Sequence, residues 1–150
     1  MKSITAMALS ALLTSFTANR TVQATPLNRQ EYNDLRGWEV PSNENPADDG
    51  YLVVNASVSE RNVESFDGYV SWLPKLAFEE QYKPNHTPID RMQIELDELH
   101  ERMDKLGAFI AKGQPEFLND DEWTLLQEQA NHMANYYNVL NARLAIAKSK

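Results

Sequence analysis

Two stretches in the second half of the chain repeat apolar residues at alternating spacings of three and four. In the first stretch they are Ile89, Met92, Leu96, Leu99, Met103, Leu106 and Ile110, and in the second Trp123, Leu126, Ala130, Met133, Tyr137, Leu140 and Leu144. This spacing gives a helix one narrow apolar seam, and two such helices bury their seams against each other. A short connection with Gly113 and Pro115 separates the stretches. We therefore predict a long antiparallel αα-hairpin, similar to a coiled coil, over residues 87–150.

Capping residues mark the ends of both predicted helices. Thr87 is a favourable N-cap, Pro88 suits the first helical position, and Asp90 lies near the positive end of the helix dipole. Asn119 caps the second helix, which has three acidic residues in its first turn and basic residues at its far end. Charge therefore complements the dipole along the second helix.

The second predicted helix has another apolar stripe beside its seam. This stripe consists of Leu125, His132, Tyr136, Val139 and Ile146. One partner helix cannot cover two stripes, so either the N-terminal module or a second copy of the chain must cover this one. We expect a homo-oligomer with these five residues at its interface, because a two-helix hairpin rarely buries enough core by itself.

A small mixed module is predicted over residues 25–84. Asn28 and Glu31 form a capping box for a short helix that ends at Gly37, and residues 41–50 are rich in turn formers. Residues 51–54 and 69–72 are typical of two strands, and Pro74 can start a helix whose Leu76, Phe78 and Tyr82 return to the sheet. The predicted fold class is α+β, with a two-stranded module followed by the helical hairpin.

Residues 1–24 are open to two interpretations. The apolar run from Ile4 to Phe16 and the small-residue sequence Val22-Gln23-Ala24 are typical of a signal peptide with its cleavage site. Polar residues dilute the run, however, and Leu9, Leu12, Leu13 and Phe16 have helical spacing, as in an amphipathic extension. We favour location in the cytoplasm, while a cleaved signal peptide would place the protein in the periplasm or outside the cell.

Composition excludes several classes of function. The formal charge of −8 and the pI near 4.8 argue against nonspecific binding of nucleic acid, which needs a basic surface. The sequence has no cysteine, so disulfides, thiolate metal sites and cysteine nucleophiles are excluded. No apolar run approaches the roughly 20 residues of a transmembrane helix.

Residues 30–83 contain several aromatic and glycine motifs: Tyr32-Asn33-Asp34-Leu35-Arg36-Gly37-Trp38, Asn43-Glu44-Asn45, Asp49-Gly50-Tyr51-Leu52-Val53, Gly68-Tyr69-Val70-Ser71-Trp72, Pro74-Lys75, Phe78-Glu79 and Tyr82. With these motifs the segment resembles a small domain that is common in tailed-phage and prophage proteins. Two features depart from it: residues 56–67 replace a short glycine-rich turn, and Leu73 stands where a capping serine is usual. In some phage proteins a similar segment precedes a domain that resembles the Thoeris anti-defence family, which sequesters nucleotide signals.

Residues 88–146 contain a second pattern: Ile89-Asp90-Arg91-Met92, Glu95-Leu96, Leu99, Leu106, Phe109-Ile110, Leu118-Asn119-Asp120-Asp121-Glu122, Leu125-Leu126, Gln129, Met133, Tyr137, Leu140 and Arg143-Leu144. With this pattern the segment resembles a helical domain of crAss-like and other tailed phages. The resemblance implies a phage accessory protein without established chemistry.

The residues favour binding over catalysis. No Ser or Thr lies in a Gly-flanked elbow, and the five glycines are scattered singly, so neither a nucleophile elbow nor a phosphate-binding loop is present. His100 and His132 fall at one level of the predicted hairpin, but Asp97 and His132 face outward and the seams lack glutamates, which disfavours a di-metal site. We predict no enzyme activity, no cofactor and no metal.

Three functions stay open. The chain can be a phage accessory protein that binds a host protein, such as a defence component. It can be an oligomeric sponge that sequesters a small anionic signal of the cyclic-nucleotide type, through Arg91, Arg102 or Arg143 at an oligomer interface. It can be an exported structural or assembly module. In the N-terminal module, the aromatic residues Trp38, Tyr51, Tyr69 and Trp72 either form a ligand-binding face or pack in the core.

Overall fold

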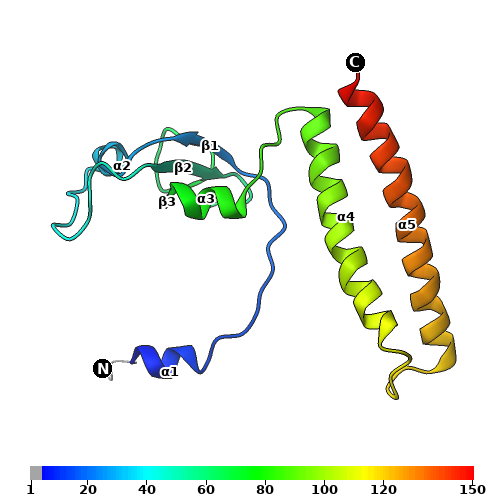
Figure 1. Cartoon of the computed structure of the whole chain (residues 1–150). Coiled ribbons are helices and arrows are strands. Elements are labelled where there is room, and N and C mark those ends of the chain that lie inside the picture. Colours follow the sequence, from blue (N-terminus) through cyan, green and yellow to red (C-terminus); the bar gives the residue numbers. More distant parts are fainter. Residues whose placement is uncertain (1–4) are drawn as a thin grey trace. The chain divides into compact units, whose positions relative to one another are not determined.

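The computed structural model describes residues 5–150, which form an α+β fold divided into two compact units (Figure 1). The first unit ends at Gln81, and the second is Tyr82–Lys150. The first contains α1 (Ala6–Ser10), β1 (Gln23–Pro26), α2 (Arg29–Arg36), β2 (Gly50–Asn55), β3 (Tyr69–Pro74) and α3 (Lys75–Gln81). The second contains α4 (Pro88–Ala111) and α5 (Asp120–Lys148). Within residues 5–150, no helix is long and apolar enough to cross a membrane.

The sheet has three antiparallel strands in the order β1-β2-β3, so the prediction of two strands was wrong. The missed strand, β1, places Gln23 opposite Val54 and Ala24 opposite Val53. A signal-peptide cut after Ala24 would therefore remove two residues from the sheet. Two strands alone are marginal in water, and the third strand gives β2 a partner on each side.

The two faces of the sheet pack against different helices. Leu52, Val54 and Val70 form a buried core with Tyr32 of α2, and Trp72 packs against its edge. Because side chains alternate along a strand, Tyr51 points to the opposite face, where its ring stacks on Phe78 of α3 at 4.1 Å between centroids. Leu76 does not return to the sheet as expected, since 73% of its side chain is exposed.

Local signals determine the ends of the helices. Capping boxes begin α2 at Asn28 with Glu31, α4 at Thr87 with Asp90, and α5 at Asn119 with Glu122. Gly37 ends α2 in the left-handed conformation, with a φ of 68°. These observations confirm the predicted starts of all three helices.

The N-terminal segment differs from the amphipathic helix that its apolar spacing predicts. Helix α1 has only five residues, and Phe16 lies beyond it with 93% of its surface exposed. Leu12 and Leu13 are also outside α1 and are largely exposed. Residues 1–4 of the predicted extension lie outside the described residues.

Helices α4 and α5 run in opposite directions and pack along their predicted seams (Figure 1). All fourteen seam residues are buried or half-buried. Leu96, Leu140 and Leu144 form the core of this unit, surrounded by Ile89, Met92 and Tyr137. Burial is deepest in the half of the unit away from the connection between the helices, where Leu140 has no exposed surface.

Candidate functional site

The apolar stripe beside the seam of α5 is exposed in the second unit. We call this stripe, formed by Leu125, His132, Tyr136, Val139 and Ile146, the outer stripe. The exposed fractions are 64% for Leu125, 44% for Tyr136, and 60% each for Val139 and Ile146. Helix α4 covers only the seam, so α5 presents a row of large apolar side chains to its surroundings. Several large apolar side chains exposed on one face of a helix are typical of an interaction site.

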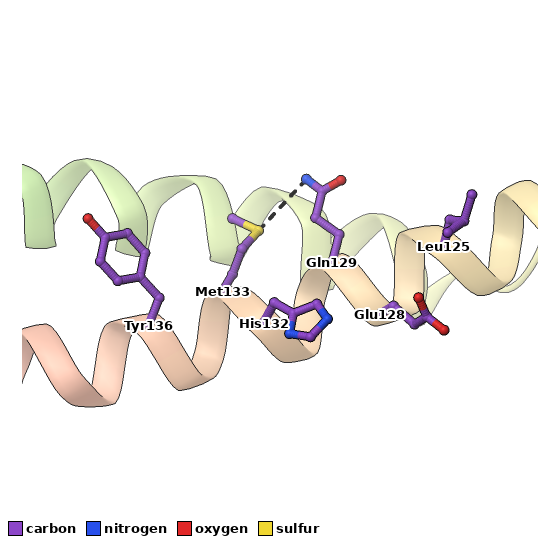
Figure 2. Close-up of a pocket in the computed structure, with 6 residues that line it drawn as sticks. All are labelled: Leu125, Glu128, Gln129, His132, Met133 and Tyr136. Carbon is purple, nitrogen blue, oxygen red and sulfur yellow. Dashed lines mark hydrogen bonds between the residues drawn. The ribbon is translucent and has the colours of Figure 1, made fainter.

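A shallow groove of about 480 Å³ lies along the first half of the outer stripe. Its lining comes from α5 alone and consists of Leu125, Glu128, Gln129, His132, Met133 and Tyr136 (Figure 2). The Gln129 amide nitrogen lies 3.9 Å from the Met133 sulfur, which links two of the lining side chains across one helical turn. The groove therefore combines apolar side chains with the polar groups of Glu128, Gln129 and His132. Three of its six residues belong to the predicted oligomer interface.

The charged residues of α4 and α5 differ in whether they are paired. Arg102 forms an ion pair with Glu98 at 3.3 Å, and Lys105 forms one with Glu101 at 2.7 Å. The ion pair with Lys105 holds the pKa of the Glu101 carboxyl below its usual value. Such exposed pairs contribute little to stability. They leave Arg102 less available to a ligand than an unpaired arginine.

Arg91 and Arg143 make no ion pair and no side-chain hydrogen bond with another residue of the described chain. Both are exposed. Arg91 lies in the first turn of α4 and Arg143 near the end of α5, so both belong to the half of the unit opposite the connection. These two cations are available for an anionic partner.

A polar network links the start of α4 to the end of α5. Lys148 donates from Nζ to Oε1 of Gln93 at 2.9 Å, and Gln93 donates from Nε2 to Oδ1 of Asp97 at 2.9 Å. Lys83 reaches the other carboxylate oxygen of Asp97 at 3.3 Å. The hydrogen bond from Gln93, with Lys83 as a further contributor, holds the pKa of the Asp97 carboxyl below its usual value. The network joins the two helices at this end of the unit.

The four aromatic residues considered as a ligand-binding face do not lie together. Trp72 and Tyr51 face opposite sides of the sheet, because Trp72 pairs with Leu52 in the register. Trp38 packs edge-on to Tyr32, with the guanidinium of Arg36 4.2 Å above its ring. Tyr69 is at the far end of β3, opposite Asn55. The structure thus gives these residues separate packing partners.

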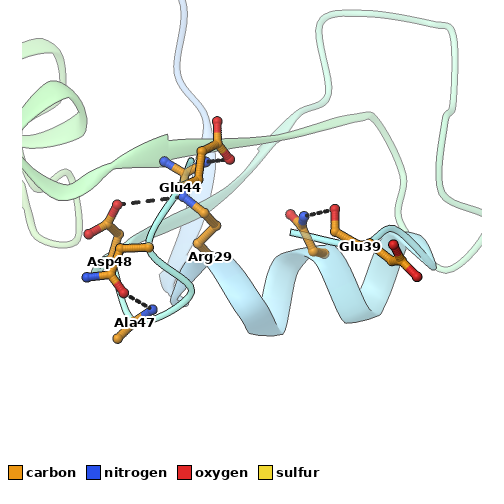
Figure 3. A network of polar contacts seen from close by, with 7 residues as sticks. Arg29, Glu39, Glu44, Ala47 and Asp48 are labelled. Atoms are coloured by element: carbon orange, nitrogen blue, oxygen red, sulfur yellow. Dashed lines mark hydrogen bonds and ion pairs between the residues drawn. The ribbon is translucent and has the colours of Figure 1, made fainter. Parts of the chain in front are cut away.

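A cluster of contacts around Arg29 in the first unit was missed by the sequence analysis. Arg29 Nη1 contacts Glu44 Oε2 at 2.7 Å (Figure 3). Its guanidinium lies 4.5 Å from the centroid of the Trp72 ring. Its Nε is buried without a hydrogen bond, since Asp48 Oδ2 is 3.7 Å away. The backbone nitrogen of Arg29 also donates to the Asp48 carbonyl. The cluster ties the acidic loop to the start of α2, which is a structural role.

Metal ligands do not converge in the described part of the chain. No group of three His, Cys, Asp or Glu side chains among residues 5–150 could hold a metal ion. His100 lies beside Asp104 at 3.5 Å and against the ring of Tyr137, while His132 belongs to the outer stripe. The histidines therefore have separate surroundings.

Comparison with known families gives a match in the second unit. Residues 86–146 match the model of a family described as Sequestin. The matched residues include all of α4, the connection and nearly all of α5, and they include none of the sheet. No curated protein and no solved structure matches the chain.

Proposed function

We propose that this chain is a non-catalytic binding protein that acts by sequestering its target, with the αα-hairpin of α4 and α5 as its binding scaffold. The supporting observation is the match of residues 86–146 to the Sequestin family model, whose name suggests a protein that withholds a ligand or partner. The exposed apolar side chains of α5 also support a protein that acts by binding a partner. A scaffold of two capped helices supplies a stable surface for such contacts.

The proposed target is a host protein, in particular a component of antiviral defence, and the proposed setting is the cytoplasm of an infected host. Residues 30–83 and 88–146 both resemble segments of tailed-phage proteins, which supports a phage or prophage accessory role. The acidic surface, with a formal charge of −8, favours a target with a basic or apolar face.

Stoichiometry tests sequestration. The full chain is titrated into the isolated host defence activity, and inhibition should saturate near one equivalent of binding sites. The target should be recovered intact after the protein is heat-denatured. Continued loss of the target at substoichiometric amounts would show turnover and contradict the proposal. A mature chain that begins at Thr25 in cells would favour an exported structural or assembly module instead.

A second candidate is a sponge for a small anionic signal of the cyclic-nucleotide type. The observation in its favour is that Arg91 and Arg143 are exposed and unpaired within the described chain, whereas Arg102 is paired with Glu98. Arginine binds a phosphate group through charge-assisted hydrogen bonds, which are stronger than hydrogen bonds between neutral groups.

Arginine variants distinguish the two candidates. If the target is an anionic signal, Arg91→Gln and Arg143→Gln should each weaken binding of a cyclic dinucleotide by at least tenfold, and binding of the unaltered chain should fall as salt is added. Arg102→Gln is the matched control and should change affinity little. If the target is a protein, the unaltered chain should not bind the cyclic dinucleotide, and the three variants should not bind it either. Calorimetric titration with and without added salt provides the measurement.

A further inference from the structure

The outer stripe is part of a second complete heptad seam on α5. Between its apolar residues lie Gln129 and Arg143, and the whole set of Leu125, Gln129, His132, Tyr136, Val139, Arg143 and Ile146 alternates spacings of four and three over three heptads. Four of its seven positions are apolar, and a heptad spacing of this length lets a helix pack along a neighbouring helix. Because α4 packs only against the first seam, the second seam of α5 can pack against one more helix.

We propose that the second copy of this chain supplies that helix, and that the two α5 helices pack antiparallel about a two-fold axis near Tyr136. The residue pattern is centred there, since Leu125 and Ile146 end it on either side at similar distances. An interface with two-fold symmetry must be self-complementary, because each half faces the other half of the partner copy. The resulting assembly has α4 and α5 of both copies, with the two α5 helices in contact.

The groove on α5 provides the first test of self-complementarity. It occupies the half of the seam from Leu125 to Tyr136, with a volume of about 480 Å³ (Figure 2). The other half of the seam presents Val139 and Ile146, each 60% exposed. An antiparallel arrangement lays these two side chains over the groove of the partner copy, and the partner does the same in return. One half of the seam thus supplies the apolar side chains, and the other half supplies the groove that receives them from the partner copy.

Charge favours the antiparallel direction. The first turn of α5 contains Asp120, Asp121 and Glu122, and its last turn contains Lys148. Arg143 lies in the seam and Glu128 borders it, and neither makes an ion pair within the described chain. Antiparallel packing brings Glu128 to about the level of Arg143 in the partner copy, whereas parallel packing opposes like charges. Charges that flank a helical seam commonly set the orientation of the partner.

The proposed dimer is independent of the proposed function, because it is inferred from the residues of α5 and not from the identity of the target. The mass of the full chain in solution tests it. Light scattering should give about twice the 17.1 kDa of one chain. Val139→Glu places a charge in the seam and should convert the protein to a monomer with unchanged helical circular dichroism. Asn138→Glu, the matched control on an exposed face of the same helix, should remain dimeric.

Crosslinking tests the direction, since the chain has no cysteine of its own. Tyr136→Cys should crosslink to itself with a short bis-maleimide, because the two-fold axis passes near this position. Leu125→Cys should not, because its two copies are about 30 Å apart along an antiparallel pair at 1.5 Å per residue. A mixture of Leu125→Cys and Ile146→Cys should crosslink between copies. A monomeric full chain, a dimer that survives Val139→Glu, or self-crosslinking of Leu125→Cys would each overturn the proposal.

Discussion

Leu140 is the residue on which the packing of α4 against α5 depends most directly. Its side chain has no exposed surface and lies in the core with Leu96 and Leu144. Leu140→Ala should leave a cavity and lower the free energy of unfolding by about 2–5 kcal/mol. Asn141→Ala, the exposed neighbour, should change it by less than about 0.5 kcal/mol. Urea denaturation followed by the helical circular dichroism signal measures both, and equal losses would contradict the assigned seam.

Trp72 is the corresponding residue of the first unit, because it combines packing with a hydrogen bond. Its indole nitrogen donates to the Leu27 carbonyl at 2.7 Å, which ties β3 to the segment between β1 and α2. Trp72→Phe removes the donor and should cost about 1–3 kcal/mol, since the carbonyl loses its partner in a half-buried site. The control is Trp38→Phe, because Trp38 is 51% exposed and its ring makes aromatic and cation contacts that phenylalanine partly keeps. Chemical denaturation should show a much smaller loss for the control.

At the scale of the element, the start of α4 links stability to pH. Asp90 accepts hydrogen bonds from the backbone nitrogens of Thr87 and His86, and these bonds hold the pKa of its carboxyl below the usual 3.8. Because the folded-state pKa is lowered, ionised Asp90 stabilises α4 above pH 3.8. This stabilisation is lost as the pH falls through the folded-state pKa.

The difference in stability between the unaltered chain and Asp90→Asn should therefore be largest near neutral pH and should vanish in strong acid. Denaturation of both proteins over a series of pH values measures it. Glu95→Gln serves as the control, since Glu95 is an exposed carboxylate of the same helix without an ion pair or side-chain hydrogen bond in the described chain. A constant difference for Asp90→Asn across the series would show that its charge does not stabilise the cap.

Helix starts and seams could be predicted because their signals are local. Asn28, Thr87 and Asn119 each lie three residues before the acidic side chain that completes the capping box. The strand β1 has no such signal, because all four of its residues are exposed at the edge of the sheet. Pro26 further lowers its resemblance to a strand. Only its pairing with β2 reveals it, and pairing is a long-range contact.

In the candidate site, too, local patterns could be predicted from the sequence, whereas long-range contacts could not. The outer stripe follows from helical spacing, so Leu125, Tyr136 and Val139 were predicted, and the structure leaves them exposed. The separation of Tyr51 from Trp72 depends on which face of the sheet each residue occupies, and the sequence analysis did not follow that alternation. The contact between Arg29 and Glu44 joins residues on either side of a turn-rich loop, so no local pattern predicts it.

For the whole molecule, the division at Gln81 separates two sources of stability. The sheet unit is stabilised within one chain, whereas the unit of α4 and α5 gains stability from a second copy if the α5 helices pair. Association that requires the folded state makes the unfolding temperature depend on protein concentration. The two units should therefore respond differently to dilution.

We expect a tenfold increase in protein concentration to stabilise the paired helices by about 1.4 kcal/mol per dimer and to raise their unfolding temperature by roughly 3–6 °C. Hydrogen exchange resolved by peptide should show this stabilisation in residues 88–148 and no change in residues 50–74. Val139→Glu should abolish the dependence, because a charge in the seam prevents association, while Asn138→Glu should retain it. If residues 88–148 are equally stable at all concentrations in the unaltered chain, the helices do not draw stability from a second copy, and their exposed stripe serves another partner.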